Sequence, residues 1–367
     1  MKRAWFEPFF RQQWQRNSAW QIVLQPLAWL FAGLSALRRG LYRSGFFRST
    51  KIAVPVIVVG NISVGGTGKT PLVVALANRL AQNGRHVGIV TRGYGRAAGG
   101  HSDEAVLISQ RSAAPVVENQ NRVAAAQACL AKFSATNIVI ADDGLQHYRL
   151  QRDLEIAVID GARGFGNGYL LPAGPLREQV ARLQSVDCLV INKTGIDQMT
   201  NSAIGAVFAA KLSQTPQPST SLFNVENKFS KPIFTMTYGR ERFASLNDQQ
   251  SCSVEDWCRH TQGKRIAAIA GIGNPERFFA HLEALGLSLD SRHAFADHHR
   301  FVVGDLMAID AEIILMTEKD AVKCRVFANQ CRAQLWQMQI DAILPEAFYD
   351  FVIDKLNKID KKLGSVN

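Results

Sequence analysis

The sequence predicts an α/β protein built on a doubly wound, mostly parallel sheet, with a second, smaller α/β domain and an N-terminal membrane-associated helix. Three observations predict this class. Short β-branched apolar runs alternate with helical segments along the chain, which is typical of a parallel sheet. A glycine-rich turn at residues 60–68 joins the first of these runs to a helix. An uncharged apolar segment at residues 17–37 precedes the whole pattern.

The composition is that of a globular protein. The chain has 367 residues, of which 47% are hydrophobic and 20% charged, so it is long enough for two domains with substantial cores. Its six cysteines are scattered and form no Cys-x-x-Cys pair, which favours free thiols in a reducing compartment over a metal site. No small-residue cleavage site follows the first apolar run, so we expect no cleavable signal peptide.

The net charge of +11 is concentrated in residues 1–51, which hold nine Lys or Arg residues and one acidic residue, Glu7. Between these charges, residues 17–37 carry large apolar side chains at helical spacing. The segment is barely long enough to span a bilayer, and its polar residues lower its hydrophobicity. We therefore favour a helix lying in the membrane interface over a true span or a buried core helix. We expect no nucleic-acid binding, because nothing in the segment resembles a base-reading module.

The most informative segment is residues 60–71, which read Gly-Asn-Ile-Ser-Val-Gly-Gly-Thr-Gly-Lys-Thr-Pro. An apolar strand precedes it and a helix follows, which is the context of a phosphate-binding loop, or P-loop. Backbone N–H groups at the start of the helix bind the phosphates, Lys69 reaches the β- and γ-phosphates, and the Thr70 hydroxyl ligates Mg²⁺. The predicted nucleotide-binding residues are those of the loop: Ser63, Val64, Gly65, Gly66, Thr67, Gly68, Lys69 and Thr70.

The loop departs from the usual pattern, because Ser63 stands where a glycine is expected. In this respect it resembles the variant loop of partitioning-type ATPases. Those proteins carry an additional lysine where this chain has Val64. The loop alone therefore predicts a nucleoside triphosphate site without deciding between a kinase, a GTPase and a motor.

The remaining expected elements alternate in type. In the first domain, strands are expected at residues 54–59, 86–91, 137–141, 155–160 and 188–191, and helices at 72–80 and 122–133. In the second, strands are expected at residues 231–238, 265–270 and 313–317, and a helix at 275–285.

These elements predict four parts of the chain. Residues 1–50 form the membrane-anchoring segment, and residues 51–220 form the P-loop domain, which ends in a polar linker. Residues 221–350 form the smaller α/β domain, and residues 351–367 form a basic amphipathic helix or tail.

A second signature of a nucleotide site follows the strand at 137–141. Asp142 stands at its carboxyl end, where a carboxylate beside the P-loop holds Mg²⁺ directly or through water. Strand alternation directs Asp143 elsewhere. The chain then turns, and Gln146 or His147 is placed to orient a substrate, although a lone histidine is more often structural.

Phosphoryl transfer to an alcohol requires a carboxylate near the incoming hydroxyl. Asp103 and Glu104 are candidates by position, in a glycine-rich loop after a strand, although the residues alone favour a solvated loop pair. In Asp297-His298-His299, a histidine is placed to orient a carboxylate, and metal binding is disfavoured because adjacent side chains diverge.

Two further motifs are excluded as nucleotide-reading elements. Residues 271–275 lack the third glycine of a dinucleotide loop and predict a structural turn before a helix. Asn192-Lys193-Thr194-Gly195 begins like the guanine-reading motif of GTPases, but Gly195 stands where an aspartate is required, so guanine specificity is not supported.

Together these segments resemble one family over almost the whole chain: the tetraacyldisaccharide 4′-kinases, the lipid A 4′-kinases of Gram-negative bacteria. The motifs that carry the resemblance are the P-loop at residues 60–71, Arg92-Gly93-Tyr94-Gly95, Asp103-Glu104, Asp142-Asp143-Gly144-Leu145-Gln146-His147, residues 171–178, Asp297-His298-His299 and Thr317-Glu318-Lys319-Asp320-Ala321-Val322-Lys323.

The resemblance implies transfer of the γ-phosphate of ATP to the 4′-hydroxyl of an acylated glucosamine disaccharide 1-phosphate. It also implies a monotopic or singly anchored protein on the cytoplasmic face of the inner membrane. By the same resemblance, Asp103 is the general base and His298 its partner, with His299 as the alternative. Glu104 and Asp142 would then lie around Mg²⁺. The residues that would support the substrate or its phosphates are Arg122, Asp143, Gln146 and Arg177.

Two other functions remain open at this stage. One is a membrane-associated ATPase or GTPase switch of the partitioning type, against which Val64 and Gly195 argue. The other is a nucleotide-binding scaffold without turnover, which the coincidence of Lys69, Thr70 and Asp142 disfavours.

Overall fold

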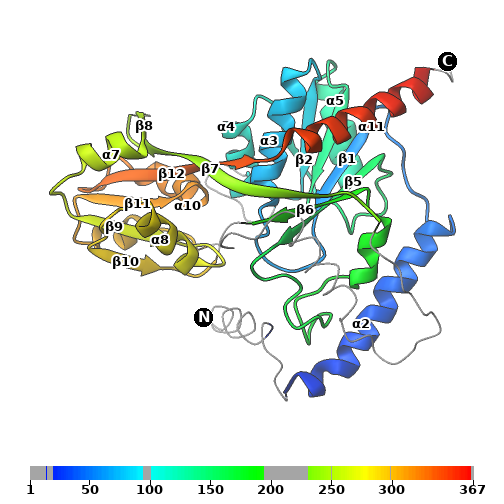
Figure 1. Cartoon of the computed structure of the whole chain (residues 1–367), viewed down its shortest axis with the longest axis horizontal. Helices are drawn as coiled ribbons and strands as arrows, with labels where there is room; N and C mark the ends of the chain where they lie inside the picture. Colours follow the sequence, from blue (N-terminus) through cyan, green and yellow to red (C-terminus); the bar gives the residue numbers. More distant parts are fainter. Residues whose placement is uncertain are drawn as a thin grey trace. The chain divides into compact units, whose positions relative to one another are not determined.

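The computed structural model describes residues 14, 20–93, 101–193, 230–248, 250–297 and 299–364 (Figure 1). The chain divides into two compact units. The first comprises Met1–Arg92, Ala114–Thr237 and Leu344–Asn367, and the second comprises Gly93–Ala113 and Tyr238–Ile343.

The first unit is built on a parallel sheet with the strand order β7-β6-β5-β1-β4-β2-β3. All of its strand pairs are parallel, including the start of β7 against β6. The strands are β1 (Val56–Gly60), β2 (Val87–Thr91), β3 (Val116–Glu118), β4 (Ile138–Asp142), β5 (Leu154–Asp160), β6 (Cys188–Asn192) and β7 (Ile233–Ser245). β1, β2, β4, β5 and β6 are buried along their whole length, as expected for strands covered on both faces.

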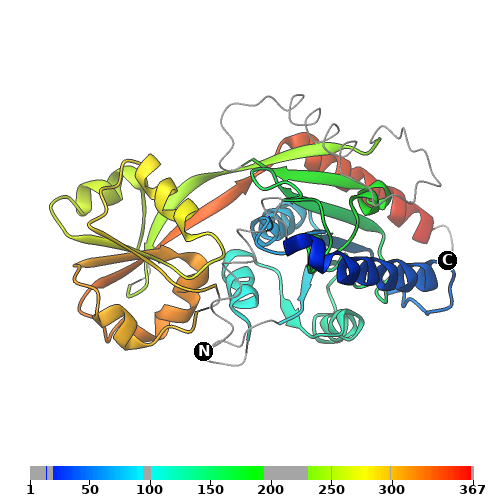
Figure 2. The ribbon, with the colours of Figure 1, turned by 90° about the horizontal axis from the view of Figure 1, so that it is seen from below.

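The described helices of the first unit are amphipathic, and all but the most N-terminal of them pack by their apolar sides. They are α2 (Trp20–Arg43), α3 (Lys69–Gln82), α5 (Arg122–Lys132), the 3₁₀ helix η1 (Val180–Ser185) and α11 (Glu346–Gly364). α5 packs on β2 and β3 and contributes Ala125, Ala126 and Cys129 to the core. α11, the red helix of Figure 2, contacts α3, where Arg79 pairs with Glu346, and Arg85, which follows α3, pairs with Asp360.

The strand order reverses at β1, which pairs with β4 on one side and with β5 on the other. In open parallel sheets, ligands bind outside the carboxyl ends of the strands at such a point. Here these ends are Gly60, Asp142, Asp160 and Asn192. The topology therefore places the P-loop and the polar strand ends at one edge of the sheet.

The second unit is a smaller α/β layer with the strand order β10-β9-β11-β12-β7, in which β8 pairs antiparallel with β7. Its further strands are β8 (Ser251–Ser253), β9 (Ile266–Ala270), β10 (Ser291–Ala294), β11 (Ile313–Thr317) and β12 (Gln334–Ile343). Its helices are α4 (Asp103–Arg111), α7 (Val254–His260), α8 (Pro275–Ala284), α9 (Val303–Met307), α10 (Glu318–Cys324) and the 3₁₀ helix η2 (Arg325–Phe327). Alternate residues of β9 and β11 supply two hydrophobic clusters, as expected for a sheet with two covered faces.

Two segments are placed differently from the sequence-based division, in which residues 93–113 lay in the P-loop domain and residues 351–367 formed a part of their own. Gly93–Ala113 belongs to the second unit, because α4 packs on α10 and Arg111 forms ion pairs with Glu318 and Asp341. The C-terminal helix begins at Glu346 and belongs to the first unit. Both placements depend on contacts between residues that are far apart in the sequence. The expected linker at 213–221 lies outside the described residues.

Candidate active site

The P-loop joins β1 to α3, as the sequence predicts. Gly65 and Gly68 have φ angles of 107° and 93°, in the left-handed region that other residues adopt only with strain. Gly68 is also the N-cap of α3, and as a glycine it has no side chain with which to cap the helix. The first backbone N–H groups of α3 are therefore available to an anion, and the helix dipole favours negative charge there.

Lys69, the first residue of α3, is held between two oxygen atoms. Its Nζ donates to Asn61 Oδ1 at 3.2 Å and lies 3.5 Å from Asp143 Oδ1. The Asn61 amide in turn donates to the Ser63 carbonyl at 2.7 Å, which fixes its orientation. The side chain of Lys69 is only 14% exposed, so these contacts also compensate for its desolvation.

The prediction that Asp143 points away from the loop is wrong. Asp143 has a φ of 49°, which breaks the alternation of β4 and turns its side chain toward Lys69 and Arg177. Arg177 Nη1 lies 3.1 Å from Asp143 Oδ2. Burial alone would raise the pKa of Asp143, but attraction to Lys69 and Arg177 outweighs it and lowers the pKa below its usual value. Asp143 is thus a carboxylate that holds two cations beside the loop.

Asp142 ends β4 opposite Val59 of β1 and is 2% exposed. Thr70 lies in the first turn of α3. A hydroxyl and a carboxylate are hard oxygen donors of the kind that Mg²⁺ prefers. In the ranges that the structure describes, no group of three or more His, Cys, Asp or Glu side chains is arranged to hold a metal ion. This donor set suits a cation held by one carboxylate and by the phosphates of a bound nucleotide.

Arg163 is a site residue that the sequence did not reveal. Its Nε donates to Asp160 Oδ2 at 2.8 Å, and its Nη2 donates to the Gly66 carbonyl. A Cβ on Gly65 would lie 3.0 Å from Arg163 Nη1, so the guanidinium lies directly against this loop glycine. Asn192 supports the same loop from β6, because its amide donates to the Thr67 carbonyl at 3.2 Å. Both residues stabilise the loop from strand ends.

Two residues predicted to bind the substrate, Gln146 and Arg122, form hydrogen bonds with other groups of the protein. Gln146 Nε2 donates to the Asn61 carbonyl and to Glu178 Oε2, each at 3.0 Å. Arg122 is 1% exposed, and its guanidinium donates to the backbone carbonyls of Asn119 and Asp142. In this structure both side chains hold the loop and the end of β4 in place.

His147 is a partly buried, neutral imidazole, and its protonation is expected to destabilise the first unit. Its Nε2 accepts from the Arg122 backbone N–H at 3.2 Å. Burial and neighbouring arginines, Arg122 first among them, lower its pKa from 6.5 to about 4. Because the folded pKa lies below the unfolded one, the stabilisation is complete above pH 6.5 and is lost as the pH falls toward 4.

The free energy of unfolding, measured with urea between pH 7.5 and 4.5, should fall with pH in the wild type. Its slope against pH should be smaller in His147→Gln. His86→Gln, at an exposed histidine in the same unit, serves as the control and should keep the wild-type slope. Identical slopes for His147→Gln and the wild type would contradict the assignment.

The two candidate carboxylates, Asp103 and Glu104, do not lie in a solvated loop. This corrects the expectation from the residues alone. Asp103 and Glu104 form the first turn of α4 in the second unit, after Ser102, whose hydroxyl accepts from the Ala105 N–H. Asp103 is 7% exposed, and Lys323 Nζ lies 4.0 Å from its Oδ2. Carboxylates are stabilised at a helix N-terminus by the dipole.

The second cluster that the sequence singled out lies in the same unit. Asp297 Oδ1 is 3.7 Å from Lys319 Nζ. His299 Nε2 lies 3.0 Å from Asp305 Oδ2, and its ring contacts the rings of Phe295 and Phe301. His298 lies outside the described residues, so its partnership with Asp103 stays a prediction.

α2 presents large apolar side chains to solvent. Val23 is 76% exposed and Leu30 is 61% exposed, and the other exposed apolar residues of the helix are Ile22, Leu27, Trp29, Leu34 and Leu37. Among the described side chains of the helix, the two that are buried, Gln21 and Ala28, are polar and small. Among the described helices, none combines the length and apolarity needed to cross a membrane.

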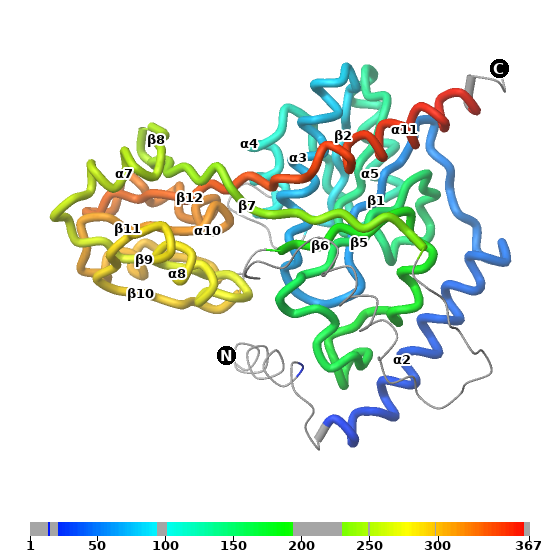
Figure 3. Tube along the Cα trace, in the orientation of Figure 1, coloured from blue at the N-terminus to red at the C-terminus, as the bar shows by residue number. Residues whose placement is uncertain are grey.

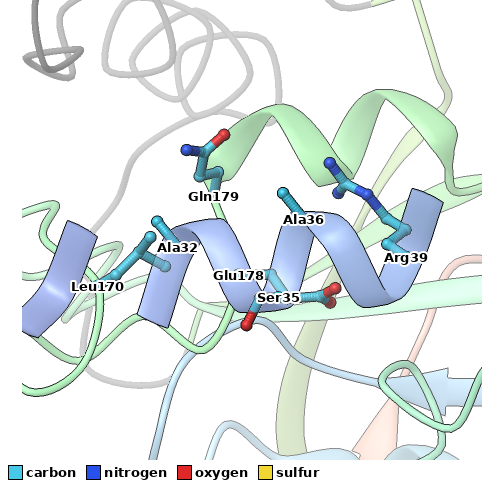
Figure 4. Close-up of a pocket in the computed structure, with 7 residues that line it drawn as sticks. All are labelled: Ala32, Ser35, Ala36, Arg39, Leu170, Glu178 and Gln179. Carbon is cyan, nitrogen blue, oxygen red and sulfur yellow. The ribbon is translucent and has the colours of Figure 1, made fainter. Parts of the chain in front are cut away.

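A small pocket separates α2 from the segment before η1 (Figure 4). Its lining residues are Ala32, Ser35, Ala36 and Arg39 of α2, together with Leu170, Glu178 and Gln179. Glu178 also accepts from Gln146 and from the Tyr148 hydroxyl. The floor of the pocket therefore belongs to the hydrogen-bond network that supports the P-loop.

Comparison with known proteins agrees with this geometry. A family model described as tetraacyldisaccharide-1-P 4′-kinase matches residues 20–357. The tetraacyldisaccharide 4′-kinase of Methylobacillus flagellatus is 40% identical over 97% of this chain and 98% of its own length. That of Herminiimonas arsenicoxydans is 41% identical over 97% of each chain. The solved structure of LpxK from Aquifex aeolicus in complex with ATP aligns with a TM-score of 0.69 and 26% identity, over 92% of this chain and 99% of that one.

Proposed function

Because this chain belongs to the tetraacyldisaccharide-1-P 4′-kinase family, we propose that it transfers the γ-phosphate of ATP to the 4′-hydroxyl of a tetraacyl disaccharide 1-phosphate. The observation that carries the proposal is the P-loop at the N-terminus of α3, with Lys69 held between Asn61 and Asp143. A triphosphate in this loop would have its β- and γ-phosphates within reach of Lys69.

The residues of the first unit are proposed to bind and orient the nucleotide. The N–H groups of residues 65–70 would bind the phosphates, whereas that of Val64, one of the predicted loop residues, donates to the Pro175 carbonyl at 2.8 Å. Arg163 and Asn192 keep the loop in shape through the Gly66 and Thr67 carbonyls. Arg177, already paired with Asp143, is proposed to support a phosphate of the substrate. Arg122 and Gln146 are proposed to act indirectly, by holding the end of β4 and the loop.

Mg²⁺ is proposed to be held by Thr70 and Asp142, with Glu104 as a further donor. When bound, the ion would neutralise the negative charge on the phosphate oxygens. Asp103 is proposed to accept the proton of the incoming 4′-hydroxyl, and His298 to orient Asp103.

Membrane association is proposed to occur through α2, on the cytoplasmic face of the inner membrane. The support for this proposal is the exposed apolar face of the helix together with the nine Lys or Arg residues within residues 1–51. A helix of this kind buries its apolar face in the acyl boundary, while the cations meet anionic headgroups. An acylated substrate remains in the bilayer, so a kinase that acts on it must work there.

Replacing the exposed leucines Leu27, Leu30 and Leu34 by serine should release the protein from vesicles of anionic phospholipid. If each leucine gives up about 1 kcal/mol of partial burial, the three together lower vesicle partitioning about 100-fold. The melting temperature in water should not fall, because these side chains are exposed in the folded protein. Co-sedimentation with the vesicles measures the effect.

A matched control replaces three equally exposed apolar residues of the second unit, Val302, Met307 and Val326, by serine. This control should co-sediment like the wild type. Undiminished binding of the α2 variant would show that α2 is not the membrane-binding helix.

The proposed function is tested by incubating the purified chain with γ-labelled ATP and the disaccharide 1-phosphate in detergent micelles. Label should appear in the lipid and depend on it. A partitioning-type ATPase would instead release labelled inorganic phosphate at the same rate with and without lipid. That result, with no labelled lipid, would refute the kinase proposal.

A further inference from the structure

The motif Thr317–Lys323 has no role in the proposed function so far. It forms the end of β11 and most of α10 in the second unit (Figure 3). α10 packs directly on α4, the helix that carries Asp103. The two helices belong to the same unit although more than 200 residues separate them in the sequence.

α10 holds α4 at both ends. At the C-terminal end of α4, Arg111 forms an ion pair with Glu318, and both side chains are about 15% exposed. At the N-terminal end, Lys323 Nζ lies 4.0 Å from Asp103 Oδ2. The motif thus sets both the position of α4 and the surroundings of its first acidic residue.

Lys323 is itself rigidly placed. Its side chain is 8% exposed, and its Nζ donates to Asp320 Oδ1 at 2.8 Å and lies 5.4 Å from the centre of the Phe301 ring. Asp320 is completely buried, and its Oδ2 accepts from Thr317 Oγ1 at 2.7 Å and from the Gly271 N–H at 2.9 Å. A carboxylate with these partners has one orientation, so the ammonium that it binds also has one position.

We propose that Lys323 is a positioning residue that holds the carboxylate of Asp103 in the orientation needed to accept a proton from the acceptor hydroxyl. This inference rests on the proposed function, in which Asp103 is the base. At 4.0 Å the ammonium attracts the carboxylate without the short bidentate pairing that an arginine makes. The attraction acts over a short distance in a water-poor environment, where it is strong.

A purely structural role, in which Lys323 only neutralises Asp320, predicts a different behaviour, and a double-mutant cycle separates the two. The variants are Lys323→Met, Asp103→Asn and the combination of both, assayed for lipid phosphorylation in micelles. Lys323→Met should lower kcat about 10²-fold through misplacement of the base, with the KM for ATP unchanged. In the Asp103→Asn background the same change should have little further effect.

Lys323→Arg and Lys323→Met/Asp320→Asn complete the test. The arginine keeps the charge and should restore part of the lost kcat. The double neutral variant removes both members of the buried pair, so it tests the role even if Lys323→Met alone fails to fold because Asp320 is left without a counter-ion. It should melt cooperatively and still show the low kcat.

The inference is overturned if the Lys323→Met enzyme has wild-type kcat. It is also overturned if the losses of kcat in Lys323→Met and Asp103→Asn multiply when the two changes are combined. It is also overturned by near-normal kcat in the double neutral variant or in Asp103→Asn. The proposed function fails in a different way, since the wild type itself would then label no lipid. If the wild type phosphorylates the lipid and Lys323→Met does so equally well, only the proposed role of Lys323 is refuted.

Discussion

Asp103→Asn is expected to lower kcat for lipid phosphorylation by about 10²–10⁴-fold, the range for loss of a positioned general base. Asparagine has nearly the same shape but cannot accept the proton of the hydroxyl. It also still begins α4, whose N-cap is Ser102. The KM for ATP should change little, because the residues proposed to bind the phosphates lie on the P-loop. Steady-state kinetics with lipid in micelles measures both parameters.

The matched control is Asp310→Asn, at a highly exposed aspartate of the same unit that pairs with Arg265 on the surface. It should keep wild-type kcat, because exposed ion pairs contribute little. Near-normal turnover of Asp103→Asn would remove Asp103 from the role of base and leave Glu104 as the remaining carboxylate of that helix turn.

Lys69→Met is expected to lower kcat by about 10²–10³-fold, as for removal of one preorganised electrostatic contact to a developing charge. Unlike Asp103→Asn, it should also weaken ATP binding, because Lys69 is proposed to contact the phosphates in the ground state as well. Methionine fills similar space, so the loop glycines keep their geometry. Isothermal titration with ATP and steady-state kinetics separate the two effects.

The control for Lys69 is Lys132→Met, at an exposed lysine of α5 in the same unit. Its ATP affinity and kcat should equal those of the wild type. If Lys69→Met bound ATP normally and kept wild-type turnover, the loop at residues 60–71 would not be the phosphate site.

Five parallel strands of the first unit, β1, β2, β4, β5 and β6, could be predicted from the sequence because each is mainly apolar. β3 was not expected, and the β7 segment was assigned to the smaller domain. The P-loop was equally clear, because Gly68 must be left-handed at the start of α3 and Lys69 follows it directly. The α/β class and the kinase family were both predicted correctly.

The elements that sequence reasoning missed depend on distant partners. α4 is short and follows a glycine-rich segment, and it is stabilised where Arg111 forms ion pairs with Glu318 and Asp341, more than 200 positions along the chain. β12 is a strand with polar residues at Gln334 and Gln337, which conceal its period. No local sequence pattern predicts the ion pairs of α4 or the strand period of β12.

The residues of the candidate site also fall into those that a motif predicts and those that only the folded structure places. Lys69, Thr70 and Asp142 stand at the ends of predicted elements, where a motif reveals them. Asp143 could not be placed, because its left-handed φ depends on the turn that brings it to Lys69 and Arg177. Arg163 belongs to no motif and is recognisable only from its contacts with Asp160 and the Gly66 carbonyl.

The central claim is that the γ-phosphate of ATP is transferred to the 4′-hydroxyl of the lipid disaccharide. A ¹H–³¹P correlation spectrum of the lipid product tests it most directly. The account predicts a new phosphorus resonance coupled to H-4 of the non-reducing glucosamine, with the 1-phosphate resonance unchanged. A new phosphorus coupled to any other sugar proton, or the release of inorganic phosphate with no new lipid resonance, would contradict it.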